Sequence, residues 1–143
     1  MSIGVKLNGV SRAKSRVKAL KQISQKQIAE GVNRAAAIVE GGAKADCPVD
    51  TGLLRGSIHI TPADVKGSSI SAQVGTNVEY APYVEFGTGA RGGYNYPTKM
   101  KLHYSKDVAG QAAQPFLGRS LNDNKNTVAA IIRGALNGAI QDV

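Results

Sequence analysis

A helical stripe of apolar residues runs through the first third of the chain and limits what it can fold into. Ser11 can cap the start of a helix, and the stripe continues to Lys44, shortly before Pro48. The residues of this stripe are Val17, Leu20, Ile23, Ile28, Val32, Ala35, Ile38 and Val39. A continuous helix of about 34 residues is about 50 Å long. A compact domain of this size is only about 35–40 Å across.

Two arrangements accommodate so long a helix. It breaks at Gly31 or at Gly41-Gly42, or its first half projects onto a neighbouring subunit. That half is strongly basic, because residues 1–44 hold most of the chain's net charge of +8. This asymmetry indicates a polyanion or an acidic partner surface, or else a solvated helix face. The basic residues proposed to face DNA or a partner are Arg12, Lys14, Arg16, Lys18, Lys21 and, in a later loop, Arg91.

The middle of the chain has the alternating pattern of β-strands. Residues 3–7, 57–61 and 70–75 alternate between apolar and polar or small side chains, which predicts three short strands. Residues 62–69 have the composition of a turn between the second and third. Residues 80–86 are amphipathic but too short for their secondary structure to be predicted.

Pro115 is predicted to open a second helix, at a position where its missing N–H does no harm. Gly134 and Gly138 weaken this helix, which predicts close packing against another backbone at both positions. Its apolar stripe consists of Leu117, Leu121, Val128, Ile131, Ile132, Leu136 and Ile140. The layout predicts an α+β fold: a small antiparallel sheet packed with a long N-terminal helix and a C-terminal helix, in a single domain of residues 1–143.

Cysteine content and hydropathy indicate the cellular compartment of the chain. Cys47 is the single cysteine, so no internal disulfide forms, which is typical of a reducing compartment such as a cytoplasm. The N-terminal residues lack an apolar run of signal-peptide length, and no stretch of eighteen apolar residues occurs. The sequence therefore predicts a non-exported chain with no membrane partner.

The tripeptide Asp50-Thr51-Gly52 matches the catalytic motif of aspartic proteases. Such an enzyme needs two carboxylates that share a proton, so a chain this short would have to dimerise across the motif. Arg55 opposes proton sharing, because a nearby cation lowers the pKa of a carboxylate. We expect Asp50 instead to accept backbone N–H bonds in the turn that leads to the next strand.

Other chemical motifs find little support. Residues 87–92 match G-x-G-x-x-G, but Pro97 and a polar segment follow where a dinucleotide site requires a helix. His59 and His103 are isolated, and Cys47 has no Cys or His partner at metal-ligand spacing. The sequence predicts no catalytic residue, no metal site and no cofactor.

All five tyrosines lie between residues 80 and 104, close to several cations. Such a mixture suits base stacking on single-stranded nucleic acid, a protein–protein interface, or simple coverage of a sheet. We favour the interface, because a Gly-rich loop of this length is more readily ordered by a partner. We expect a flexible Gly/Tyr-rich loop at about residues 87–113.

Three blocks in this order resemble the head–tail joining, or tail-completion, proteins of long-tailed bacteriophages. The first is AKADCPVDTGLLRGSI at residues 43–58, the second VGTNVEYAPYVEFGTG at residues 74–89, and the third QPFLGRSL at residues 114–121. The positions carried over by this resemblance, as assembly residues, are Pro48, Asp50, Thr51, Gly52, Leu54, Arg55, Ser57, Tyr80, Ala81, Tyr83, Glu85, Phe86, Gly87, Thr88, Pro115 and Phe116.

The resemblance implies a non-enzymatic virion protein of the neck. It implies a homo-oligomeric ring of six subunits between head-closure proteins and the tail-terminator or tail-tube proteins, with genomic DNA passing through the channel. Such a protein is made in the cytoplasm of the bacterial host and ends in the virion. The alternatives are a tail terminator that caps the tail tube and a nucleic-acid-binding protein that uses the basic helix.

Two hypotheses concern individual residues of these blocks. Arg55 and Glu85 are opposite charges in otherwise apolar motifs, so we expect them to form an ion pair. Gly87 opens the Gly-rich loop, so we expect Gly87→Val to impair head–tail joining more than folding.

Overall fold

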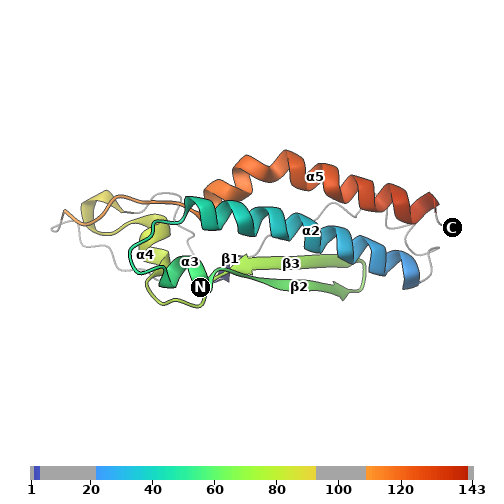
Figure 1. Cartoon of the computed structure of the whole chain (residues 1–143), viewed down its shortest axis with the longest axis horizontal. Helices are drawn as coiled ribbons and strands as arrows, with labels where there is room; N and C mark the ends of the chain where they lie inside the picture. The colour runs from blue at the N-terminus through green and yellow to red at the C-terminus, as the bar shows by residue number, and fades with distance from the viewer. Residues whose placement is uncertain (1, 4–21, 93–108, 142–143) are drawn as a thin grey trace.

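The computed structural model describes residues 2–3, 22–92 and 109–141. In Figure 1 two long helices and a small sheet run along the long axis, and short helices gather toward one end. The elements are β1 (Ser2–Ile3), α2 (Gln22–Asp46), α3 (Leu53–Ser57), β2 (His59–Lys66), β3 (Ser69–Gly75), α4 (Ala81–Phe86), the 3₁₀ turn η1 (Gly89–Arg91) and α5 (Leu117–Gln141). The predicted α+β class, with a small antiparallel sheet and two long helices, is confirmed.

The sheet is antiparallel in the order β1-β3-β2. Its hairpin is tighter than predicted, because the turn is only Gly67-Ser68 and β2 runs through Pro62. Pro62 fits because the register shifts between Thr61 and Asp64, where a residue without an N–H breaks no ladder bond. The neighbouring N–H of Ala63 donates to Asn33 Oδ1 on α2 at 2.7 Å, so the helix supplies the partner that the ladder lacks.

Helix α2 is continuous over 25 residues, with no break at Gly31 or at Gly41-Gly42. It ends at Asp46, before Pro48, as predicted. The predicted stripe is correct at Ile28, Val32, Ala35 and Val39, which are buried, and wrong at Ile38, whose exposed fraction is 40%. Residues 11–21, and with them the proposed projection onto a neighbour, lie outside the described residues.

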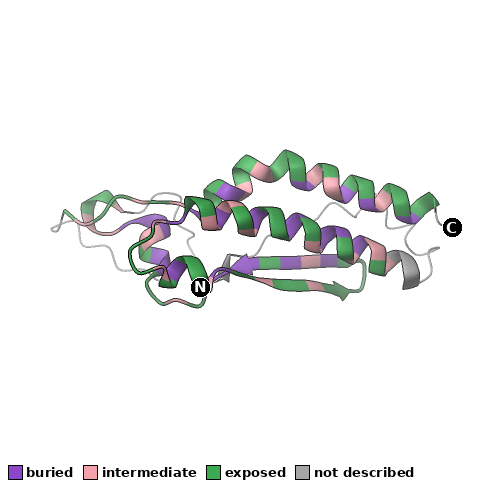
Figure 2. Ribbon diagram, in the orientation of Figure 1, coloured by how far each residue is buried: buried purple, intermediate pink, exposed green. Residues whose placement is uncertain are grey.

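The core lies where α2 meets the hairpin and α5, and Figure 2 shows α5 exposed along its outer face. From the hairpin, Ile70, Ala72 and Val74 of β3 are buried. From α5, the predicted residues Leu117, Val128 and Ile132 are buried, and Leu121, Ile131 and Leu136 are partly buried. Ile140, with 39% exposed, is the one member of that stripe left largely outside.

The two long helices, α2 and α5, approach each other closely at glycines of α2. A Cβ on Gly31 would collide with Ala135 of α5, and one on Gly42 would collide with Ser120. Ser120 Oγ donates to the carbonyl oxygen of Val39 at 2.7 Å, which ties the helices together within the core. The predicted close packing at Gly134 and Gly138 is wrong, because both are exposed and have open space around their Cβ positions.

This contrast between glycines predicts opposite effects of the same substitution. Gly31→Ala should lower the free energy of unfolding by about 2 kcal/mol, because the added methyl group forces the helices apart. Gly134→Ala should raise it by about 0.5–1 kcal/mol, because alanine restricts the unfolded chain and meets nothing in the helix. Urea denaturation of both variants measures the difference, and adding Ala135→Gly to Gly31→Ala should recover part of the loss. Equal losses in the two single variants would contradict the close approach.

Candidate functional site

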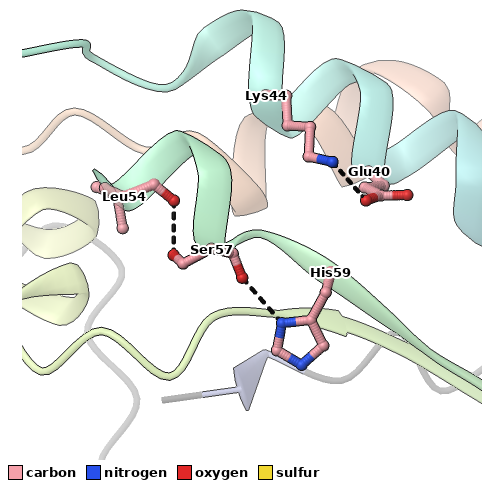
Figure 3. Close-up of polar contacts among 5 residues, drawn as sticks. All are labelled: Glu40, Lys44, Leu54, Ser57 and His59. Atoms are coloured by element: carbon pink, nitrogen blue, oxygen red, sulfur yellow. Dashed lines mark hydrogen bonds and ion pairs between the residues drawn. The ribbon is translucent and has the colours of Figure 1, made fainter. Parts of the chain in front are cut away.

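The first two sequence blocks meet at one end of the molecule, where α3 and α4 lie beside each other (Figure 1). Ser57 connects them. Its Oγ donates to the carbonyl oxygen of Leu54 at 2.7 Å and lies 2.5 Å from the Oγ1 of Thr76, a buried residue of the second block. The Ser57 carbonyl accepts a 2.8 Å bond from Nδ1 of His59, at the start of β2 (Figure 3). A carbonyl cannot donate, so Nδ1 carries the proton.

The turn before α3 is built differently from the prediction for Asp50. Asp50 is exposed and forms no hydrogen bond or ion pair with any residue that the structure describes. The N–H of Leu53 is bound instead by Thr51 Oγ1, at 3.3 Å. Gly52 turns the chain with φ +82°, in the left-handed region that glycine adopts without strain.

Glu85 is the central polar residue of the second block. Its carboxylate is 2% exposed, and its oxygens accept backbone N–H bonds from Phe116 (2.9 Å), Leu117 (3.1 Å) and Gly118 (2.9 Å). These are donors of the first turn of α5, which have no partner within the helix, and the helix dipole favours an anion there. The predicted ion pair between Arg55 and Glu85 is therefore wrong. Glu85 joins the second block to the third.

The two ends of the Gly-rich segment are held together next to Glu85, which caps the N-terminus of α5. The N–H of Thr88 donates to the carbonyl of Gln111 at 2.8 Å, and the N–H of Gln111 donates to Thr88 Oγ1 at 2.9 Å. The N–H of Gln114 donates to the carbonyl of Val84 at 2.8 Å. We name these paired ends, residues 84–88 and 111–114, the loop stem.

Gly87 lies inside the loop stem and is buried. Its φ is +78°, and a Cβ there would lie 2.6 Å from the carbonyl oxygen of Gln111 and 2.7 Å from the nitrogen of Ala113. Backbone atoms on the opposite side of the stem occupy the space, which argues against the expectation that Gly87→Val impairs joining more than folding. Of the predicted loop, residues 93–108 lie outside the described part of the chain.

A groove of about 480 Å³ opens between the turn before α3 and helix α4. It is lined by Pro48, Val49, Asp50, Thr51, Gly52, Leu53, Leu54, Tyr80, Val84 and Gln111. Leu53, Val49 and Tyr80 expose 60%, 58% and 43% of their surfaces, the three highest fractions among the large apolar residues described. Exposed apolar residues gathered around one hollow are typical of a binding surface.

The remaining predicted residues divide into buried supports and exposed contacts. Ala81, Phe86 and Phe116 are buried, Pro115 is half-buried, and Tyr83, Arg55 and Arg91 are exposed. Arg12, Lys14, Arg16, Lys18 and Lys21 lie outside the described residues, as do Tyr94, Tyr96, Tyr104 and His103. The structure thus brings the block residues together, and of the proposed basic residues it places Arg91 alone.

The described residues contain no group of three or more His, Cys, Asp or Glu side chains placed to bind a metal ion. Cys47 is a free, buried thiol. Burial raises its pKa, the Arg55 cation opposes that rise, and the Glu85 carboxylate adds to it. A raised thiol pKa disfavours the nucleophilic thiolate. Within residues 2–3, 22–92 and 109–141, none of the helices has the length and apolar character needed to cross a bilayer.

The sequence interpretation missed three residues that hold this end and the sheet in place. Asn33, Thr76 and Gln111 each bond to a segment distant in the chain. Thr76 stands in the second block, between the third strand and α4, and a hydroxyl buried there needs a partner. For Asn33 and Gln111 no pattern in the sequence marks the role.

Residues 11–87 match the model of the HK97-gp10-like family, described as "Bacteriophage HK97-gp10, putative tail-component". No curated protein and no solved structure matches the chain significantly. The matched range is more than half of the 143 residues, and it includes the whole first block and residues 74–87 of the second. The chain belongs to the HK97-gp10-like family of bacteriophage tail components.

Proposed function

We propose that this tail component is a neck protein: a non-enzymatic tail-completion ring that joins the head-closure proteins to the tail and lets genomic DNA pass. The observation that carries the proposal is the groove. The residues shared with head–tail joining proteins in the first two blocks build an exposed apolar surface, together with the buried bonds that hold it rigid. Apolar and tyrosine side chains of this kind form the cores of protein–protein interfaces.

The same residues argue against the protease alternative. Asp50 is exposed to solvent, whereas a carboxylate that shares a proton with a second one needs a shielded site. Thr51 serves the turn through its hydroxyl, and Gly52 serves it through its backbone conformation. The tripeptide is thus accounted for by the turn that places Leu53 at the groove.

Loss of this protein from the phage should separate the neck function from its alternatives. We expect a phage that carries a stop codon in this gene to accumulate DNA-filled heads and tails of normal length that are not joined. Adding the purified protein to that lysate should restore infectious particles. Gold-labelled antibody against the chain should bind the head–tail junction of wild-type particles in electron micrographs.

The other outcomes favour other functions. Tails of abnormal length in the mutant lysate would indicate a tail terminator, because a protein that caps the tube also limits its growth. Gold on the tail tube or tip would remove the protein from the neck. Joined particles in the mutant lysate, with affinity of the purified protein for DNA that falls steeply with salt, would indicate a nucleic-acid-binding protein.

A further inference from the structure

We infer that the groove of one copy receives the β2–β3 hairpin tip of the next copy. The hairpin tip is defined here as residues 64–69, around the turn Gly67-Ser68. The inference rests on the ring in the proposed function, and it names the two surfaces that join neighbouring subunits.

The apolar side chains that line the groove are not covered by the described part of the chain. Leu53, Val49 and Tyr80 are the most exposed large apolar residues described, and all three line it. Removing apolar surface from water is worth about 25 cal/mol per Å². A hollow of about 480 Å³ is within the range of pockets that hold a ligand, so it suits a narrow protruding element better than a flat face.

The hairpin tip is such an element. In Figure 1 it lies toward the opposite end of the long axis from α3 and α4. Val65 has an exposed fraction of 40%, although its partner across the hairpin, Ile70, is 3% exposed. A two-residue turn keeps the tip narrow, so Val65 is presented on a small projection.

One charge in the groove can pair with one charge of the hairpin tip. Among the described residues, Asp50 is the one charged residue that lines the groove, and it has no bonded partner there. Lys66 follows Val65, its side chain is 83% exposed, and it pairs only loosely with Asp64 at 3.4 Å. An exposed pair of this kind contributes little stability, so Lys66 is free to exchange partners. The tip as a whole has no net charge, because Asp64 offsets Lys66, so the complementarity is that of Val65 with the apolar lining and of the Lys66 cation with Asp50.

The position of the two surfaces decides the type of assembly. Because they lie toward opposite ends of the molecule, the tip of a copy reaches a neighbour's groove in a head-to-tail contact. A contact between two different surfaces leaves one of each free, so subunits add until a ring closes. Each groove is complete only when the next copy supplies Val65.

Two variants, each defective on one surface, test this directly. We expect Leu53→Glu (groove) and Val65→Glu (tip) each to be folded and monomeric by sedimentation velocity, where the wild type forms a ring. An equimolar mixture should form a one-to-one dimer and nothing larger, because one intact groove meets one intact tip. Ile38→Glu is the matched control, since Ile38 has the same 40% exposure on α2, and it should assemble like the wild type.

Several results would overturn the inference. Rings formed by either variant alone, or a mixture that stays monomeric while the wild type assembles, would do so. Assembly lost in Leu53→Glu but kept in Val65→Glu would give the groove another occupant. A charge exchange adds a second test: Asp50→Lys should weaken association about tenfold, and Lys66→Glu added to it should restore it.

A third measurement covers the case in which the wild type is monomeric in solution. Leu53→Cys and Val65→Cys, combined with Cys47→Ser, should give disulfide-linked ladders when phage particles are oxidised. A monomeric protein without such ladders would end the inference. Rings that survive every groove and tip variant would contradict this contact and leave the neck assignment intact. Gold labelling away from the neck would contradict the neck assignment and leave the contact intact.

Discussion

Glu85→Ala should lower the free energy of unfolding by about 3–5 kcal/mol, because it leaves several buried backbone N–H groups without an acceptor. In a domain of this size such a loss lowers Tm by about 10 °C or more. The cap is lost at the N-terminus of α5, a helix of 25 residues that covers α2. Differential scanning calorimetry of the purified variant measures the change.

Two controls identify the cause of that loss. Glu85→Gln keeps one side-chain acceptor without the charge, so its Tm should fall between those of Glu85→Ala and the wild type. Glu79→Ala removes an exposed carboxylate six residues earlier, and it should change the free energy of unfolding by less than about 0.5 kcal/mol. If Glu85→Ala and Glu79→Ala melted together, the cap on α5 would contribute nothing to stability.

The second large effect is expected at Gly87. Gly87→Ala should cost about 3 kcal/mol or more, because its φ of +78° is strained for any L-residue and the new Cβ meets backbone of residues 111 and 113. Gly52→Ala is the comparison: its φ is +82°, its ψ of 0° is left-handed helical where that of Gly87 is −176°, and nothing lies within 4 Å of its Cβ position. It should cost only about 1–2 kcal/mol, the price of the left-handed backbone alone. Urea denaturation compares the two, and equal losses would mean that the loop stem yields to the methyl group.

Features that repeat along the chain could be predicted from the sequence. The apolar period of α2 and α5 and the alternation in β2 and β3 recur every few residues, so a local pattern reveals them. Pro62 misled the prediction of the hairpin turn, because the bulge that tolerates it depends on a bond from the N–H of Ala63 to Asn33, on another element. Ile38 misled the prediction of the buried stripe of α2, because an apolar residue at the edge of a stripe need not be covered.

Contacts between segments that are distant in the sequence were predicted poorly. Glu85 is 31 residues from Phe116, and no periodicity in the sequence connects a carboxylate with the start of a helix so far away. The same limit explains why close packing was predicted at the wrong glycines. Gly31 and Gly134 differ only in what the partner helix places opposite them. The resemblance singled out the block residues, but their meeting at one end of the fold and their bonds followed only from the structure.

The loop stem has a consequence for how such chains can differ from one another. Because Thr88 and Gln111 bind each other and Gly87 packs against the far side, the distance between α4 and α5 is set at the stem itself. The number and kind of residues between them can therefore vary without moving either helix, since extra length in a closed loop adds little free-energy cost. A phage lineage could thus exchange this segment as a cassette while the rest of the subunit stayed unchanged.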